Sequence, residues 1–270
     1  MQFPKFPDWL LYASVAAAIL VVAAGRRENA GAPPPPPPVP GEADTPLDPA
    51  LPFDPAEVID VPQGAGGAVA TAFSVAERGV WLTSAQAVRG CRRLAVAVAE
   101  GRGVKARVAL ADLGGVAVLT TKGGGRPLSS RGGGAPRSGE RGFMPGFPAG
   151  PGEASARFLG PGEHADGPSL VWAETGRTEG LTAGLPTLAG APVIDETGRV
   201  AGLVVTSSHR RGTFSSTGTQ AVSHAIAKAG VTPSQGAEQT VDTTNYARVA
   251  DELRRDLSVV EVKCLQGVRR

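Results

Sequence analysis

The chain is poor in the residues that mark several common classes of protein. It has two cysteines among 270 residues, too few for a disulfide framework or a cysteine-based zinc site. Aromatic residues make up 5%, the net charge is +2 and no basic stripe is interleaved with aromatics, so nucleic acid is not an expected partner. The three histidines have no metal-ligand spacing, so neither a metal nor another cofactor is expected. They are His164, His209 and His224.

Glycine and proline, in contrast, are abundant, with 37 and 24 residues. From about Val58 to Gly230, short β-type runs alternate with glycine and proline turns. This spacing predicts an all-β antiparallel barrel or sandwich. The clearest runs are residues 68–75, 80–83, 94–98, 106–110, 115–120, 170–173 and 200–206.

The first segment, residues 1–28, contains an uncharged run from Trp9 to Ala24 that ends at Arg26. As a helix this run is about 24 Å long, a little short of a hydrocarbon core of ~30 Å. It is either a membrane anchor or a secretory signal, since small residues precede a cleavage point after Ala24. The domain is therefore expected outside the cytoplasm, in the periplasm, anchored through residues 9–24 or secreted if residues 1–24 are removed.

Three further regions follow this segment. Residues 29–57 contain six consecutive prolines, Pro33 to Pro38, and are expected to be a disordered, extended stalk. Residues 58–232 form the predicted β domain. In residues 233–270, apolar residues at helical spacing between Tyr246 and Leu257 predict a helix, and alternation from Leu257 to Cys264 predicts a strand, both packing on the domain.

The two cysteines fall in different parts of this organisation. Cys91 precedes the predicted strand 94–98 and Cys264 ends the predicted C-terminal strand. A disulfide between them would tie the tail to the domain if the compartment is oxidising. Two buried thiols are the alternative.

Several blocks of sequence carry a resemblance to a known family. They are ATAFSV at 70–75, GVWLTSAQAV at 79–88, ADLGGVAVL at 111–119, GFMPGFP at 142–148 and LAGAPVIDETGRVAGL at 188–203. In order and spacing they resemble the trypsin-like serine peptidases of the HtrA (Deg) type, over about residues 69–227. The resemblance implies a trypsin-like double β-barrel, in which GFMPGFP corresponds to a turn before the central strands of the second barrel.

The same resemblance identifies the positions of a catalytic triad. Gln86 stands where the family has its histidine, Gly115 where it has aspartate, and Ala189 where it has the nucleophilic serine. None of the three side chains supplies the base, the carboxylate or the nucleophile that the mechanism needs. In the oxyanion loop, Thr187 replaces a glycine and Gly190 follows Ala189.

No other residue is expected to replace the triad. Asp112 lies three positions before Gly115, which places it on the opposite face of a strand. The three histidines fall in a polar loop, at a strand end and in an alanine-rich segment, and we expect none of them to be catalytic.

The resemblance therefore implies a pseudopeptidase, a member of the family that does not cut. We expect a membrane-tethered module outside the cytoplasm that binds or scaffolds a peptide or protein partner, whose identity the sequence does not give. Two alternatives stay open. One is a serine-type endopeptidase with residual activity or unrecognised catalytic residues. The other is a structural envelope component whose barrel positions the stalk and tail.

Overall fold

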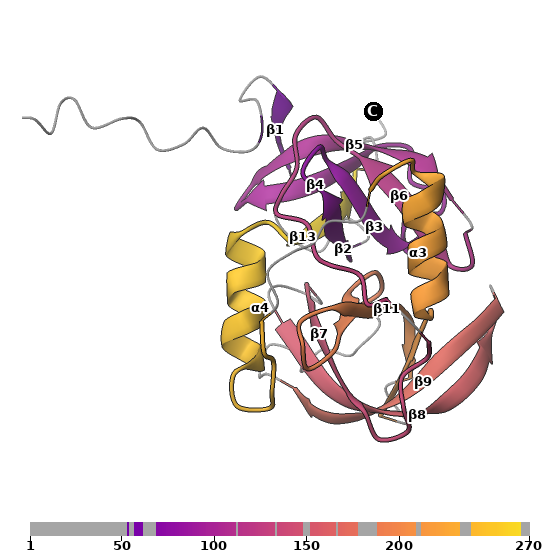
Figure 1. The fold of residues 1–270 in the computed structure, drawn as a ribbon. Helices are drawn as coiled ribbons and strands as arrows, with labels where there is room; N and C mark the ends of the chain where they lie inside the picture. The colour runs from indigo at the N-terminus through magenta and orange to yellow at the C-terminus, as the bar shows by residue number, and fades with distance from the viewer. Residues whose placement is uncertain are drawn as a thin grey trace, which may run out of the picture. The chain divides into compact units, whose positions relative to one another are not determined.

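The structure is a computed structural model that describes residues 53, 57–61, 69–111, 113–132, 134–147, 152–165, 167–177, 188–208, 212–232 and 239–265. The anchor or signal segment, the proline run and Thr187 lie outside these residues. Within the described ranges, no helix combines the length and apolar content needed to cross a bilayer. The expected all-β double barrel is confirmed, with six strands closing each barrel (Figure 1).

Barrel 1 contains the segments that resemble the first half of the family. Its strands are β2 (Val69–Ala76), β3 (Val80–Ser84), β4 (Leu94–Ala99), β5 (Arg102–Leu110), β6 (Val116–Thr120) and β13 (Val259–Cys264). Around the barrel their order is β13-β2-β3-β6-β5-β4, and a short strand β1 (Val58–Asp60) pairs with the outer edge of β5. Each pairing is antiparallel.

Barrel 2 is built from one continuous stretch of the chain. Its strands are β7 (Arg141–Gly146), β8 (Gly152–His164), β9 (Gly167–Arg177), β10 (Pro192–Ile194), β11 (Val200–Ser208) and β12 (Thr213–Ser216). Their order around the barrel is β7-β8-β9-β12-β11-β10. Strand β8 and strand β9 form a long hairpin that pairs from Ala154–Arg177 to His164–Gly167.

One segment of barrel 2 differs from its expected role. The sequence GFMPG was assigned to a turn, and it forms β7 instead. Pro145 is tolerated there because β10 pairs with β7 only at Phe143, so the edge of β7 near Pro145 is free of that ladder. The sequence pattern of β7 does not predict a strand, and β7 is a strand because it pairs with the neighbouring β8.

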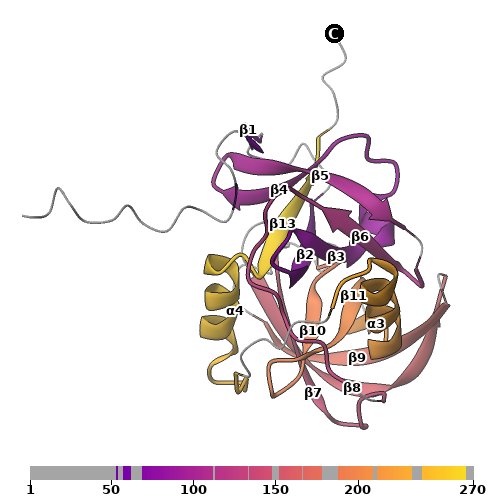
Figure 2. The same cartoon turned by 45° about the horizontal axis from the view of Figure 1, so that its top comes forward.

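The C-terminal strand β13 is part of barrel 1. It lies between β2 and β4, with Val260 opposite Ala72 and Val262 opposite Val96. In both views the yellow strand lies among the indigo and purple strands of this barrel (Figures 1 and 2). The sequence analysis placed this strand in an extension packed on the domain, whereas the structure makes it one of the six barrel strands.

Three hydrophobic cores explain why many strands are apolar on both faces. In β6, Ala117 and Leu119 belong to the core inside barrel 1, whereas Val116 and Val118 face a core that also contains residues of barrel 2. Barrel 2 has its own interior, which includes Trp172. A strand between two cores has no solvent face, so its sequence is a continuous apolar run.

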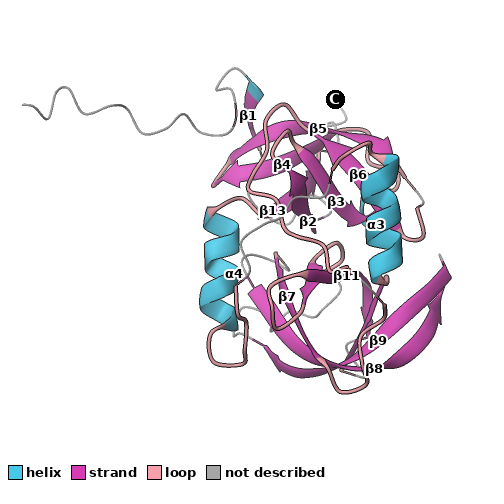
Figure 3. Ribbon diagram, viewed as in Figure 1, coloured by secondary structure: helices cyan, strands magenta, loops and turns pink. Residues whose placement is uncertain are grey.

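Three helices complete the described domain (Figure 3). They are α2 (Ala85–Val88), α3 (Thr219–Lys228) and α4 (Tyr246–Arg255). Helix α3 packs on β6 and β11, and α4 packs on β7, β8 and β13, so both helices contact both barrels. The end of α4 turns directly into β13, because Ser258 N–H donates to the carbonyl of Leu253 and Leu257 takes a positive φ of 53°.

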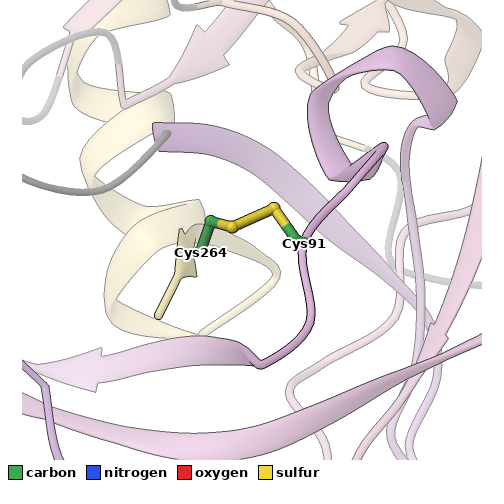
Figure 4. Close-up of a disulfide and its surroundings, with 2 residues drawn as sticks. All are labelled: Cys91 and Cys264. Atoms are coloured by element: carbon green, nitrogen blue, oxygen red, sulfur yellow. A yellow bond between two sulfur atoms is a disulfide. The ribbon is translucent and has the colours of Figure 1, made fainter. Parts of the chain in front are cut away.

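The two cysteines form a disulfide, as one of the two readings of the sequence expected. Their Cα atoms lie 5.5 Å apart, and the bond joins β13 to the segment between α2 and β4 (Figure 4). The backbone strengthens this junction, since Leu265 N–H donates to the carbonyl of Arg93 over 2.7 Å. The tail is thus held in barrel 1 covalently and by main-chain hydrogen bonds.

Candidate functional site

The loop that carries Ala189 lies against barrel 1. Thr71 N–H of β2 donates to the carbonyl of Ala189 over 3.0 Å, and Ala191 N–H donates back to Leu188 over 2.9 Å. Leu188 is fully buried and Ala189 is half-buried. A tight turn therefore presents the methyl group of Ala189 at the junction of the two barrels.

Gly190 makes the closest approach in this loop. Its φ is +87°, and a Cβ atom there would lie 2.0 Å from the carbonyl oxygen of Thr71 and 2.5 Å from Oγ1 of Thr83. Only glycine fits a position that combines this backbone conformation with such contacts. Gly190 N–H also donates to Val204 over 2.8 Å, which fixes the loop to β11.

The other two positions that the resemblance assigns to the triad lie on the segments next to this loop. A Cβ on Gly190 would lie 3.1 Å from the backbone nitrogen of Ser84, which directly precedes α2 and the exposed Gln86. Ala85 N–H donates to the carbonyl of Gly115 over 2.9 Å. These contacts bring the segments of Gln86, Gly115 and Ala189 to one place between the barrels.

The backbone at Gly115 has an unusual conformation. Gly114 and Gly115 have φ values of +65° and +85°, both in the left-handed region. An aspartate at position 115 would adopt this conformation at a cost of about 1–2 kcal/mol. Asp112, the nearest carboxylate in the sequence, lies outside the described residues.

The chemistry of this place follows from its side chains. A methyl group, a carboxamide and a hydrogen atom stand at the three positions, and none of them ionises near neutral pH. The hydroxyl of Ser84 is fully buried and has no hydrogen-bond partner within the described part of the chain. Of the described histidines, His164 ends β8 and His224 lies exposed on α3, whereas His209 lies outside the described residues.

One strand beside the loop has a backbone edge with which no described segment pairs. Val204 N–H donates to Ala191, and β10 pairs with β11 no further than Leu203. From Thr206 to Ser208, β11 pairs on one side with β12, and no described segment pairs with its other side. Such an edge offers main-chain donors and acceptors to an extended polypeptide.

A cavity of about 390 Å³ extends from the same region. It begins at Gly114 and lies between the far end of the β8–β9 hairpin and the start of α3. None of the described residues that line it is charged; they include Ala135, Pro161, Pro168, Leu170, Thr219 and Ala221. The cavity suits apolar side chains.

The tail supports the site from the other side. Arg254 of α4 donates to Oε2 of Glu153 over 2.6 Å and to the carbonyl of Gly152 over 2.8 Å, and both side chains are buried. The guanidinium also lies 5.6 Å from the ring centroid of Phe147, whose N–H donates to Thr71 Oγ1 over 3.0 Å. No sequence pattern predicts this network, since Arg254 and Glu153 lie 101 residues apart.

Comparison with known proteins gives one family and several structures. The model of the family described as "Trypsin-like peptidase domain" matches residues 70–203. A comparison with curated protein sequences found no match.

The solved structures that resemble this chain include peptidases of the HtrA type. The HtrA-type protease AlgW with decapeptide is 19% identical, with a TM-score of 0.46 over 60% of this chain and 52% of that one. The inactive form of the Rv3671c protease is 20% identical, with a TM-score of 0.47 over 61% and 89% of the two chains. A serine-to-alanine mutant of Rv3671c from M. tuberculosis H37Rv, also an inactive form, is 20% identical, with a TM-score of 0.43 over 61% and 88%.

The length of the match differs between these structures, since this chain spans about half of AlgW. The strand order of the two barrels agrees with the family match, which runs from β2 to the first part of β11. Through residues 70–203 the chain belongs to the trypsin-like peptidase domain family.

Proposed function

We propose that this protein is a membrane-tethered pseudopeptidase outside the cytoplasm that holds an extended polypeptide segment beside Ala189 without cutting it. The observation that carries the proposal is the meeting of three segments whose side chains at Gln86, Gly115 and Ala189 lack any base, carboxylate or nucleophile. Acyl transfer by a serine–histidine–aspartate triad uses all three roles, and loss of one alone lowers the rate by orders of magnitude.

The backbone of the site supports binding rather than cleavage. The free edge of β11 at Thr206–Ser208 can add an antiparallel strand from a partner, and this needs no reactive side chain. The cavity next to Gly114 can take apolar side chains of that strand. The left-handed conformation of Gly115 is a glycine geometry, which indicates a loop shaped without an aspartate.

The location rests on two features. A disulfide between Cys91 and Cys264 is typical of an oxidising compartment. The uncharged run from Trp9 to Ala24 supports a tether to the membrane, and residues 29–57 would then be the spacer that carries the domain.

A peptide-capture experiment tests the proposal. The full chain, solubilised in mild detergent, is incubated with a random peptide library, and retained peptides are sequenced and measured by anisotropy. Ala189→Phe fills the junction and should weaken binding by about tenfold or more, the effect of a ~1.4 kcal/mol loss. Ala173→Phe places the same ring at a half-buried alanine of β9 and should bind as the parent does. Equal binding by both variants, or no retained peptide, would contradict the proposal.

A further inference from the structure

The outer surface of barrel 1 carries positive side chains that the peptide site does not use. Arg93, Lys105 and Arg107 are all exposed. Across the described residues, none of the three has a recorded ion pair or side-chain hydrogen bond. We call these residues the basic face.

Strand register places the three side chains together. Leu94 pairs with Ala106, and both point into the core of barrel 1. Arg93 immediately precedes Leu94 at the bend before β4, and Arg107 follows Ala106 on β5, so both lie at the same end of this pair. Lys105 lies opposite Ala95 one step further along. Like charges gathered in this way repel one another, and a bound anion would relieve the repulsion.

Neighbouring acids do not neutralise the basic face. Glu57 bonds to Lys122, Glu261 to Lys263 over 3.3 Å, and Asp60 lies 4.0 Å from Arg102. Glu100 lies in the β4–β5 turn beside Arg102, away from Arg107. Among the described residues, the acids of this surface therefore pair with other cations or lie at its far end.

The chain enters the domain on the same surface. Strand β1 runs along β5, with Val58 opposite Val104, one residue from Lys105. The residues before Val58 are those of the expected stalk and anchor. A domain tethered at this point keeps its basic face at high effective concentration near the bilayer.

We propose that the basic face of Arg93, Lys105 and Arg107 binds anionic phospholipid headgroups of the membrane that holds the anchor. This inference rests on the membrane tether of the proposed function and adds a surface to it. Arginine forms paired hydrogen bonds with phosphate oxygens, and each basic residue near an anionic surface contributes attraction that salt screens. The peptide site would then be held in a fixed relation to the bilayer.

Lysine footprinting tests the inference with an internal control. The full chain is reconstituted in nanodiscs of phosphatidylcholine alone or with about 30% phosphatidylglycerol, and acetylation rates are read by mass spectrometry. Lys105 should be acetylated about fivefold more slowly in anionic discs, and about 0.5 M salt should restore its rate. Lys228, exposed on α3, should react equally in both discs.

Two charge-matched variants sharpen the result. Arg93→Gln with Arg107→Gln should abolish the protection of Lys105, whereas Arg137→Gln with Arg255→Gln, at exposed arginines outside barrel 1, should leave it unchanged. Equal acetylation of Lys105 in both lipids, or equal loss in both variants, would overturn the inference.

The outcomes separate this inference from the proposed function. A chain that does not enter nanodiscs overturns both the tether and the basic face. Failure of peptide capture while Lys105 stays protected contradicts the peptide site alone. Retained peptide binding without lipid-dependent protection contradicts the basic face alone.

Discussion

The two barrels of this protein have the same strand order but obtain their strands differently. If the strands are numbered 1 to 6 in the order β13, β2, β3, β4, β5, β6 for barrel 1 and β7 to β12 for barrel 2, both follow the order 1-2-3-6-5-4 around the barrel. In barrel 2 position 1 is β7, the first strand of a continuous stretch, whereas in barrel 1 it is β13, the last strand of the chain. The same architecture thus takes its first strand from the start of a continuous stretch in barrel 2 and from the C-terminal part of the chain in barrel 1.

This difference has a physical consequence for stability. Barrel 2 closes when β9 pairs with β12 and β7 pairs with β10, all within residues 141–216. Barrel 1 has no pairing between β2 and β4 until β13, far along the chain, pairs with both. The entropic cost of closing a loop grows with its length, so the closure of barrel 1 costs more. The Arg254 network lies just before β13 and the disulfide lies at its end, where both offset that cost.

The largest expected effect comes from breaking barrel 1 at β13. Val262→Asp places a charge in the core of barrel 1, where no partner is recorded among described residues, and should cost more than about 4 kcal/mol of unfolding free energy. With Trp9→Phe in both backgrounds, tryptophan fluorescence during denaturant unfolding reports barrel 1 in Trp172→Phe and barrel 2 in Trp81→Phe, since Trp81 is buried in barrel 1 and Trp172 in barrel 2.

Glu261→Gln is the matched control on the same strand. Its side chain points away from the interior of barrel 1 and pairs with Lys263, so loss of the charge should cost no more than about 1 kcal/mol. A Val262→Asp protein with parent-like unfolding would show that β13 does not close barrel 1.

A slightly smaller effect is expected where the tail meets barrel 2. Arg254→Met leaves the carboxylate of Glu153 buried without its main partner and should destabilise by about 3–5 kcal/mol. Replacing both residues, with Glu153→Leu added, should recover most of that loss. Thermal and urea unfolding of both variants measure the difference, and equal stability of the single and double variants would argue against a buried ion pair.

The disulfide is expected to contribute about 2–4 kcal/mol. Cys264→Ser should lower the unfolding free energy by this amount, and Cys91→Ser should do the same because either change removes the bond. Adding reductant to the parent should reproduce the loss and should leave both variants unaffected. Mass spectrometry that finds two free thiols in the air-oxidised parent would rule out the bond.

The smallest effect concerns the start of the tail helix. Asp242 Oδ1 accepts from Thr244 Oγ1, Thr244 N–H and Asn245 N–H, and the Thr244 hydroxyl is the main reason that the pKa of Asp242 is lowered from 3.8. Because the pKa of Asp242 is lower in the folded state than in the unfolded state, its carboxylate stabilises the fold at pH values above the unfolded-state pKa. This stabilisation is lost as the pH falls through the folded-state pKa. Asp242→Asn should therefore unfold at a lower temperature than the parent near neutral pH, and the gap should narrow below about pH 4. A constant gap would exclude the carboxylate as its cause.

Much of barrel 1 was predictable from sequence, and little of barrel 2. Runs such as residues 80–83 and 94–98 are apolar because they lie against cores, and they became β3 and β4 with small boundary shifts. Strands β7 and β8 contain glycine, proline and charged residues, and they are strands because their neighbours in the barrel pair with them. Local composition carries no information about such pairing.

The candidate site shows the same division. The positions Gln86, Gly115 and Ala189 followed from motif order, and the backbone contacts place their segments together. Motif order does not predict the positive φ of Gly115, which depends on the conformation of the loop. It also does not predict the hydrogen bonds of Arg254, which belongs to a tail distant in sequence. The membrane location and the loss of activity stay predictions.

The most direct test of the proposed function is whether a bound peptide stays intact. Peptides retained by the full chain are incubated with it for a day and weighed by mass spectrometry, and the protein is treated in parallel with a fluorophosphonate probe. We expect intact peptides and no labelled residue. A cleaved peptide together with a fluorophosphonate adduct that is absent from heat-denatured protein would contradict it.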